Sequence, residues 1–223
     1  MNISMPITKK RIANHFQYFW WVYLLLLVIG IFGWNLIHTV TRYQSPPHLK
    51  VEWYFAGYQL DDGTGAETLM DKAHQEALPE MEEVSYRYVM LDEMNGDMML
   101  TTWVFAGEGD LYALPKEKFR NLAQSGSMMN LQPYVDSGAL NLDGIDLTDC
   151  YVTEPESGEE WLCGIPMNVI PGLEAYGLYG DDTYLSVLIN GGNDDNTIKL
   201  LSWLLETCKE PVAQEEPAAV PAA

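Results

Sequence analysis

The sequence predicts an α/β domain with a mainly parallel sheet flanked by helices, preceded by one transmembrane helix. Two observations favour this fold class. Residues 18–37, YFWWVYLLLLVIGIFGWNLI, contain no charged side chain, and an α-helix of about 20 residues spans a bilayer. Strand-like and helix-like segments then alternate from Lys50 to Gln124, and this alternation with right-handed crossovers is typical of a parallel sheet.

The apolar segment is predicted to remain as an anchor. Both of its ends carry aromatic residues, which membrane interfaces favour. A cleaved signal peptide is the alternative, but its apolar region is shorter and is followed by a small-residue cleavage pattern, which the sequence after Ile37 does not show. The basic cluster Lys9, Lys10 and Arg11 lies before the segment, so the positive-inside rule puts the N-terminus in the cytoplasm and the rest of the chain outside the cell.

The domain organisation follows from this orientation and from composition. Pro46 and Pro47 mark a polar linker, and the last residues are rich in Pro, Ala and Glu, which is typical of disorder. We expect a cytoplasmic tail over 1–16, a transmembrane helix over 17–38, a linker over 39–48, an extracellular α/β domain over 49–208 and a disordered tail over 209–223.

The soluble elements are expected in a fixed order. In the first strand, residues 50–58, Val51, Trp53 and Phe55 alternate with Glu52 and Tyr54, which is the period of a strand. A helix over 66–78 ends near Pro79, and a second strand covers 84–91. Residues 97–106 fit a helix or a strand. A third strand covers 110–114, and Pro115 suits the first turn of a helix that continues to 124.

The segment Leu100–Phe119 contains the turn Gly107-Glu-Gly-Asp110 between an apolar segment and the third strand. It resembles the first lobe of the extracellular solute-binding proteins of ABC importers, and the resemblance favours a helix over 97–106. Trp161-Leu-Cys-Gly-Ile-Pro166 is similar to the family's Y-G-I-P strand, and Asn193–Glu206 to its late helix. The resemblance covers roughly 49–207 in pieces, and the second lobe of the family has no counterpart here.

The resemblance implies a ligand site and a class of partner. In that family the loop after the first strand and the Gly-rich turn line the cleft, so Tyr58, Glu108 and Asp110 would border any remaining site. Aromatic faces suit sugars and carboxylates suit their hydroxyls, so a small solute such as a sugar is one expected ligand. Trp53 and Trp103 are expected in the core. A membrane permease or another surface protein is the expected protein partner.

Charge and cysteine content narrow the functions further. Residues 51–223 hold all 32 acidic residues and 7 of the 12 basic ones, so nucleic-acid binding is excluded as a main role. Cys150 and Cys163 flank a predicted hairpin, and we expect a disulfide between them, with two reduced thiols as the alternative. Cys208 is then unpaired.

A catalytic or metal-dependent role is not expected. Beyond the apolar segment the sequence offers only His38, His48 and His74 as histidine bases. The acidic loops at 61–67, 180–182 and 191–196 lack the spacing of an EF-hand, so ordinary turn and helix-cap chemistry explains them better than a calcium site. We therefore expect no cofactor and no bound metal.

Three functions remain open. The first is a membrane-anchored, single-lobe binding or docking module at the cell surface. The second is an accessory interaction subunit of a permease or another surface protein, without a small ligand, and an exposed apolar patch at the cleft face would favour it. An aromatic-lined concave pocket with carboxylates would favour the first. An enzyme is the third.

Overall fold

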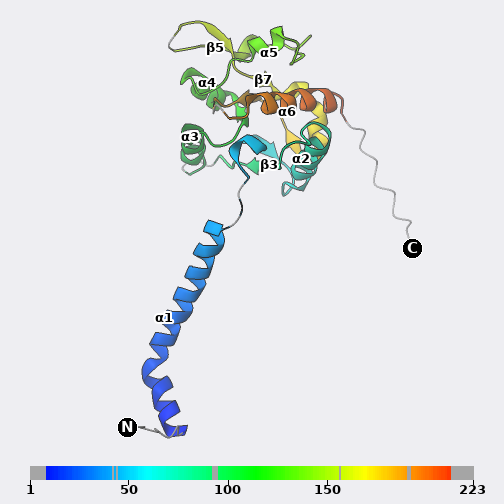
Figure 1. Ribbon diagram of the computed structural model, residues 1–223. Helices are drawn as coiled ribbons and strands as arrows, with labels where there is room; N and C mark the ends of the chain where they lie inside the picture. Colours follow the sequence, from blue (N-terminus) through cyan, green and yellow to red (C-terminus); the bar gives the residue numbers. More distant parts are fainter. Residues whose placement is uncertain are drawn as a thin grey trace, which may run out of the picture. The chain divides into compact units, whose positions relative to one another are not determined.

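The computed structural model describes residues 9–41, 43, 45–91, 95–155, 157–189 and 192–211, with the backbone alone for 9–14 and 16. The chain divides into two compact units, Met1–Gln44 and Ser45–Ala223, and Figure 1 shows the first as the helix α1 and the second as the α/β domain. Residues 1–8 and 212–223 lie outside the described residues, and so do most of the two predicted tails.

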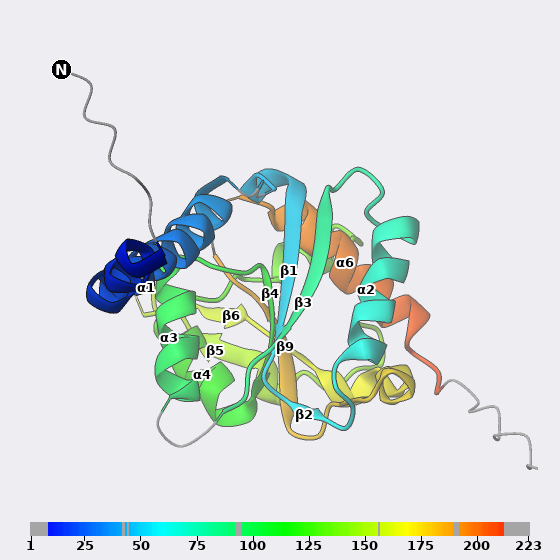
Figure 2. The ribbon, with the colours of Figure 1, turned by 90° about the horizontal axis from the view of Figure 1, so that it is seen from below.

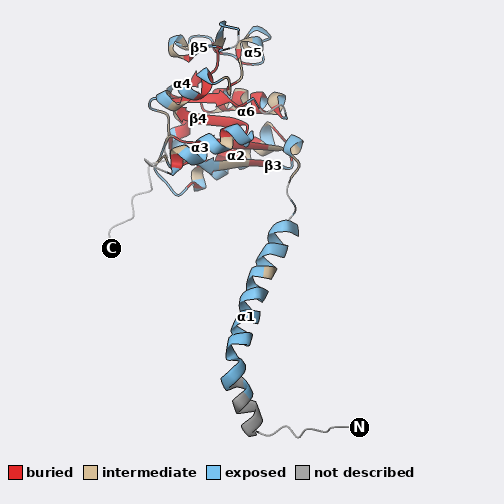
Figure 3. Cartoon of the chain, turned by 90° about the vertical axis from the view of Figure 1, so that its left-hand side faces the viewer, coloured by how far each residue is buried: buried red, intermediate tan, exposed pale blue. Residues whose placement is uncertain are grey.

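Helix α1, Lys9–Thr41, contains the predicted apolar segment. The part Gln17–Thr41 has a mean hydropathy of 2.0 and no buried residue, and Figure 3 shows its residues as exposed, apart from one of intermediate burial. Within the described part of the chain, this is the one helix long and apolar enough to cross a membrane. A signal sequence near the N-terminus can also meet this criterion of length and composition.

The core of the domain is a five-stranded mixed sheet with the order β3-β1-β4-β9-β7. Strands β1 (Lys50–Phe55), β3 (Glu83–Tyr88) and β4 (Leu111–Pro115) are parallel. Strand β9 (Thr183–Val187) is antiparallel to β4 and to β7 (Ile165–Pro166). The α/β class is confirmed, and the sheet is only partly parallel because the chain reaches β9 through turns and 3-10 helices instead of a crossover helix.

Helices cover both faces of the sheet. Figure 2 shows α2 (Thr64–Glu76) and α6 (Asp194–Thr207) on one side, and α3 (Gly96–Ala106) and α4 (Lys116–Gln124) on the other. Because both faces are covered, five consecutive residues of β1 are buried despite their alternation in the sequence. Figure 3 shows these buried strands at the centre of the domain.

The two faces of β1 pack against different aromatic residues. Trp53 meets Phe55 and Tyr86 edge to face, with ring centroids 5.8 Å apart in both pairs. Tyr54 instead stacks on Tyr112 at 5.0 Å and meets Trp103 at 5.2 Å. Trp53 is completely buried and Trp103 is half-buried against the core, as the sequence predicts.

The remaining elements are short. Two small antiparallel sheets pair β2 with β8 and β5 with β6. The bounds of these strands and of the short helices are β2 Tyr58–Gln59, α5 Gln132–Asp136, β5 Tyr151–Thr153, β6 Glu160–Leu162, β8 Leu178–Tyr179, η1 Pro47–Leu49, η2 Thr148–Cys150, η3 Met167–Val169 and η4 Pro171–Tyr176.

The ambiguous segment 97–106 forms a helix, α3, as the family resemblance favours. The predicted hairpin between Cys150 and Cys163 also forms, as β5 and β6. The disulfide across it does not form in the structure, where Cys150, Cys163 and Cys208 are all buried free thiols. The two residues are backbone neighbours, because the Cys163 N–H donates to the carbonyl oxygen of Cys150 at 3.0 Å, but the Cys163 Sγ is directed to the Met128 carbonyl oxygen, 4.0 Å away.

Candidate functional site

Asp110, which the family resemblance places at a cleft, is a buried residue that joins two strands. Its Oδ2 accepts a hydrogen bond from the Glu52 N–H at 2.8 Å, and its own N–H donates to the carbonyl oxygen of Glu52 at 3.1 Å. Only 6% of Asp110 is exposed. A buried carboxylate that accepts a backbone hydrogen bond stabilises the local fold, so Asp110 holds the start of β4 against β1.

Gly109 shows the same close packing. Its φ is 77°, in the left-handed region that glycine adopts readily. A Cβ at this position would lie 2.5 Å from ring atoms of Tyr54. The Gly-Glu-Gly-Asp turn therefore fits the surface of β1, and this packing accounts for Gly109 and Asp110.

Tyr58 and Glu108 are exposed, but they lie at opposite edges of the sheet. Glu108 precedes β4, at the amino edge of the parallel strands, whereas Tyr58 follows the carboxyl end of β1. Trp53 pairs with Leu111, so Asp110 lies beside Glu52. The rest of β1, through Phe55, separates that level from Tyr58, which comes after the strand ends. The three predicted residues therefore do not form one site.

Two adjoining hollows lie along α6, and we call them together the α6 groove. The first, of 350 Å³, surrounds the start of the helix and includes His48 and Asp194 in its lining. The second, of 530 Å³, follows the helix past Ile198 and Trp203. Both are lined by Tyr134 and Asp195. The groove is thus a concave surface that combines aromatic, apolar and carboxylate groups.

The groove is built from one face of α6. Asp195, Lys199, Ser202, Trp203 and Glu206 recur every three or four residues, which places them on the same side of a helix. Residues of this helix that face the sheet, such as Leu201 and Leu204, are fully buried. The groove therefore forms where the polar face of the amphipathic helix meets α5 and the segment after it.

Contacts to α2 and to the segment after it hold the groove's central side chains in place. The Trp203 Nε1–H donates to Glu76 Oε2 at 3.1 Å, and the Lys72 ammonium lies 5.9 Å from the centroid of the indole ring. Lys199 Nζ donates to Glu80 Oε1 at 2.9 Å and to Asn196 Oδ1 at 3.1 Å. The contacts with Glu76 and Lys72 orient the indole before any ligand arrives, which reduces the entropic cost of binding.

The end of the groove at the start of α6 is negative and partly desolvated. Burial raises the pKa of Asp194 and Tyr134, and the Asp195 carboxylate raises both further. Asp194 Oδ1 is buried and has no hydrogen-bond partner among the described residues. Carboxylates in such a place accept hydrogen bonds from ligand O–H or N–H groups.

A second surface lies at the carboxyl ends of β1 and β3. Tyr58 and Met90 are 65% and 66% exposed there, and Leu60 and Tyr88 are also exposed. Tyr58 meets Tyr179 edge to face at 5.8 Å. We call Tyr58, Leu60, Tyr88 and Met90 the carboxyl-edge patch. Exposed apolar side chains at the carboxyl edge of an α/β sheet suit a ligand or a protein partner.

The three cysteine thiols are buried, and His74 is engaged in a hydrogen bond. Burial raises the pKa of Cys150 to about 12 and the pKa of Cys163 and Cys208 to about 11, so these thiols are poor nucleophiles at neutral pH. His74 Nε2 donates to the Met81 carbonyl oxygen at 2.8 Å. Over the described ranges, the structure contains no group of three His, Cys, Asp or Glu residues arranged to hold a metal.

The sequence pattern does not identify the groove residues as a site. The loop at 191–196 fits turn and helix-cap chemistry, and Trp203 belongs to the segment that is similar to the family's late helix. One signal in the sequence does point to the groove. Trp203 lies eight residues after Asp195 and four after Lys199, so it shares the polar face of the amphipathic helix, where a large aromatic side chain is unusual.

No protein-family model matches the chain, and neither does any curated protein. Among solved structures, it is similar to a family 1 extracellular solute-binding protein from Alicyclobacillus acidocaldarius, with 23% identity over 55% of this chain and 29% of that one, and a TM-score of 0.40. It is also similar to the galacto-N-biose-/lacto-N-biose I-binding protein of an ABC transporter from Bifidobacterium longum, with 13% identity over 55% and 29%, and a TM-score of 0.37.

A de novo designed esterase gives 21% identity over 54% of this chain and 28% of that one, with a TM-score of 0.41. The chain thus spans less than a third of the length of these structures. The similar structures include members of the solute-binding family that the sequence resembles. They do not identify any binding residue of this chain. What the chain shares with them is part of an α/β fold.

Proposed function

We propose that the chain is a membrane-anchored, non-catalytic binding module whose α/β domain lies outside the cell. The α6 groove is the observation that carries the binding role. Its Trp203 and Tyr134 rings offer apolar contact area to the C–H face of a sugar, and the carboxylates of Asp195 and Glu206 accept hydrogen bonds from hydroxyls. We therefore propose a small polyhydroxylated solute, a sugar, as the ligand of the groove.

The open shape of the groove limits the affinity. A ligand held on one side keeps much of its surface in water, whereas tight sites bury most of the ligand. We therefore expect dissociation constants of about 0.01 to 1 mM, weaker by several kcal/mol than nanomolar binding. A module of this affinity would concentrate a solute at the cell surface.

Binding is tested with the full-length chain in detergent by titration calorimetry against a panel of di- and trisaccharides. Trp203→Leu should weaken binding at least tenfold, because the variant loses the aromatic face. Trp161→Leu is the matched control, since Trp161 is also half-buried but lies on β6. Absence of binding to every sugar, or an equal loss in both variants, would contradict the proposal.

The anchor and its orientation need their own measurement. Helix α1 has the length and hydropathy of a span, and the basic residues before it favour a cytoplasmic N-terminus. The chain should stay in the membrane after alkaline extraction, and protease added to intact cells should degrade its C-terminal domain. A chain of lower mass that begins after α1 would show that the segment is a cleaved signal.

The carboxyl-edge patch favours a second candidate function, an accessory subunit that docks on a permease or another surface protein. The exposed apolar side chains at this edge support it. Leu60→Asp and Met90→Asp should abolish co-purification of a membrane partner with the full-length chain. Met98→Asp is the matched control, because Met98 is 70% exposed on α3. Loss of the partner in all three variants would argue against a specific role of the patch.

A further inference from the structure

The apolar helix α1 carries one amide side chain, Asn35, within its uncharged segment. The part Gln17–Thr41 is centred on residue 29, so Asn35 lies about 9 Å along the axis from the centre. That depth is within a hydrocarbon core of about 30 Å. If α1 spans the membrane as proposed above, Asn35 is therefore in contact with the apolar interior.

The hydrogen bonds of Asn35 are only partly satisfied within its own helix. Thr39 Oγ1 donates to the Asn35 carbonyl oxygen at 2.9 Å and approaches its Oδ1 at 3.4 Å. The Nδ2 amide group has no hydrogen-bond partner among the residues that the structure describes. A polar group without a partner in hydrocarbon carries a free-energy cost, and a neighbouring helix that supplies a partner removes it.

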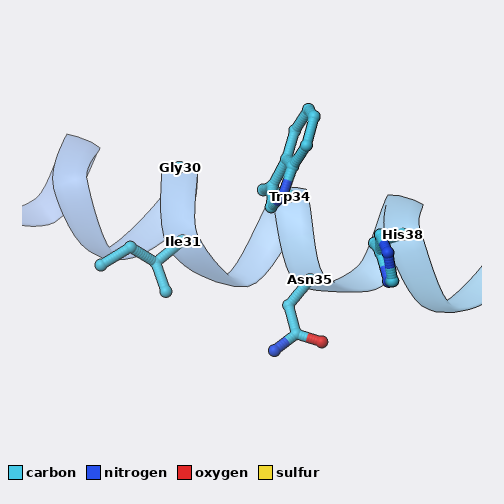
Figure 4. Close-up of a pocket in the computed structure, with 5 residues that line it drawn as sticks. All are labelled: Gly30, Ile31, Trp34, Asn35 and His38. Atoms are coloured by element: carbon cyan, nitrogen blue, oxygen red, sulfur yellow. The ribbon is translucent and has the colours of Figure 1, made fainter.

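Asn35 belongs to one face of α1. Gly30, Ile31, Trp34, Asn35 and His38 line a shallow hollow on the helix surface, and their spacing of three and four residues places them on one side. Figure 4 shows Ile31 and Asn35 projecting in the same direction, one turn apart, and Trp34 projecting in the opposite direction in this view. A Cβ added at Gly30 would have no atom within 4 Å, so a second helix can approach closely there.

We propose that this face pairs α1 with α1 of a second copy of the chain. Two copies inserted in the same orientation are parallel in the membrane, so their Asn35 side chains lie at the same depth. A carboxamide both donates and accepts, so two of them satisfy each other across a two-fold axis, which is the geometry of an isologous dimer. Gly30, about a turn and a half away, leaves room for the helices to pack.

The test is energy transfer between two differently labelled populations of the full-length chain in lipid vesicles, titrated by the protein-to-lipid ratio. Asn35→Leu should lower the association constant about 3- to 30-fold, the range found for interhelical hydrogen bonds in membranes. Gly30→Leu should also lower it, because the added side chain separates the helices. Asn35→Gln, which keeps an amide, should retain more association than Asn35→Leu.

Gly33→Leu is the matched control. Gly33 also has no atom within 4 Å of an added Cβ, but it is not part of the lining of the hollow. The inference is overturned if Gly33→Leu weakens association as much as Gly30→Leu, or if Asn35→Leu leaves the titration unchanged. A monomeric chain that captures a different membrane protein through Asn35 would overturn it as well.

The proposed anchor and the proposed dimer are tested by different measurements, so one can be disproved without the other. Alkaline extraction and the intact mass of the chain report on the anchor, and the energy transfer reports on pairing. A chain that stays in the membrane at full mass without energy transfer overturns the dimer and leaves the anchor in place. A chain released or shortened at its N-terminus overturns both.

Discussion

The turn before β4 and the turn before α6 look alike in sequence but differ in the structure. In each, glycine precedes aspartate at the start of a regular element: Gly109 directly precedes Asp110, just before β4, and Gly192 and Asn193 precede Asp194, the first residue of α6. Asp110 is 6% exposed, and its carboxylate accepts the N–H of Glu52. Asp194 is half-buried, lines a hollow of 350 Å³, and has one carboxylate oxygen without a hydrogen-bond partner among the described residues.

The difference shows when an aspartate at such a turn stabilises the fold and when it can contact a ligand. Asp110 lies beside the parallel strand β1, whose backbone supplies a donor in fixed register. Asp194 instead shares the lining of its hollow with Tyr134 and Asp195, which leaves a concave, negative surface. A carboxylate already satisfied by a strand is not available to a ligand, whereas one that lines a hollow is.

The largest expected effect is that of Gly109→Ala at the packed turn. The new Cβ would lie 2.5 Å from the Tyr54 ring, and Tyr54 is held by stacking on Tyr112 at 5.0 Å. Overpacking costs about 1–3 kcal/mol, and the left-handed backbone costs about 1 kcal/mol more. We expect the free energy of unfolding to fall by about 2–4 kcal/mol in urea denaturation of the full-length chain.

Gly138→Ala separates these two costs. Gly138 has a φ of 78° and no atom within 4 Å of an added Cβ, so it carries the backbone cost alone. The loss at Gly138 should therefore be about 1 kcal/mol. Equal losses at the two glycines would show that the turn before β4 is not closely packed on Tyr54.

The next effect is that of Asp110→Ala. The substitution leaves the buried Glu52 N–H without its acceptor, which costs about 1–3 kcal/mol. Asp110→Asn should lose less, because the amide oxygen can still accept. Both variants should bind sugar with unchanged affinity while they remain folded. A variant of normal stability that has lost binding would restore Asp110 as a ligand residue.

The local elements could be predicted from the sequence because their signals are local. The alternation of Val51, Trp53 and Phe55 marks β1, and Pro115 immediately precedes α4, which begins at Lys116. The direction of β9 depends on the path of the chain through 3-10 turns between β7 and β9, and no local pattern encodes that path. The sequence therefore predicts the α/β class but not the mixed sheet.

The site was harder to predict because it depends on which groups face one another. Glu108 and Asp110 both belong to the Gly-Glu-Gly-Asp turn, but the register of β1 and β4 determines that the Asp110 carboxylate accepts the backbone N–H of Glu52. Trp203 and Tyr134 come from segments nearly seventy residues apart, and only packing of α6 near α5 brings them to one groove. Disulfide formation also depends on distances that a sequence does not give.

A third prediction compares how much the carboxylates of the groove and the carboxylate of Glu108 each contribute to the affinity for a sugar. Asp195→Asn and Glu206→Gln should each weaken binding to the full-length chain about tenfold, since a hydrogen bond to a charged group contributes about 1.5–3 kcal/mol. Glu108→Gln should leave the affinity unchanged, because Glu108 is exposed at the end of α3 and does not line the groove. Titration calorimetry measures the affinity of each variant for the sugar. A loss of affinity confined to Glu108→Gln would favour the site that the sequence predicts.

The smallest effect is a pH dependence of opposite sign at two aspartates. Burial and the Asp195 carboxylate raise the pKa of Asp194 above 3.8, so the folded state binds its proton more tightly than the unfolded chain does. Folding stability from this group is therefore lost as the pH rises from 3.8 through the folded pKa. Hydrogen bonds from Thr64 lower the pKa of the exposed Asp62, so its contribution is lost as the pH falls through its folded pKa.

Urea denaturation of the wild type, Asp194→Asn and Asp62→Asn between pH 3 and 7 measures both effects. The stability of Asp194→Asn relative to the wild type should increase as the pH rises above 3.8, because the variant no longer places a charge in the partly desolvated end of the groove. The relative stability of Asp62→Asn should decrease as the pH rises, because the wild type gains the ionised Asp62 that Thr64 stabilises. Two differences of the same sign would mean that Asp194 is satisfied by its surroundings, as Asp110 is, and the α6 groove would lose its negative end.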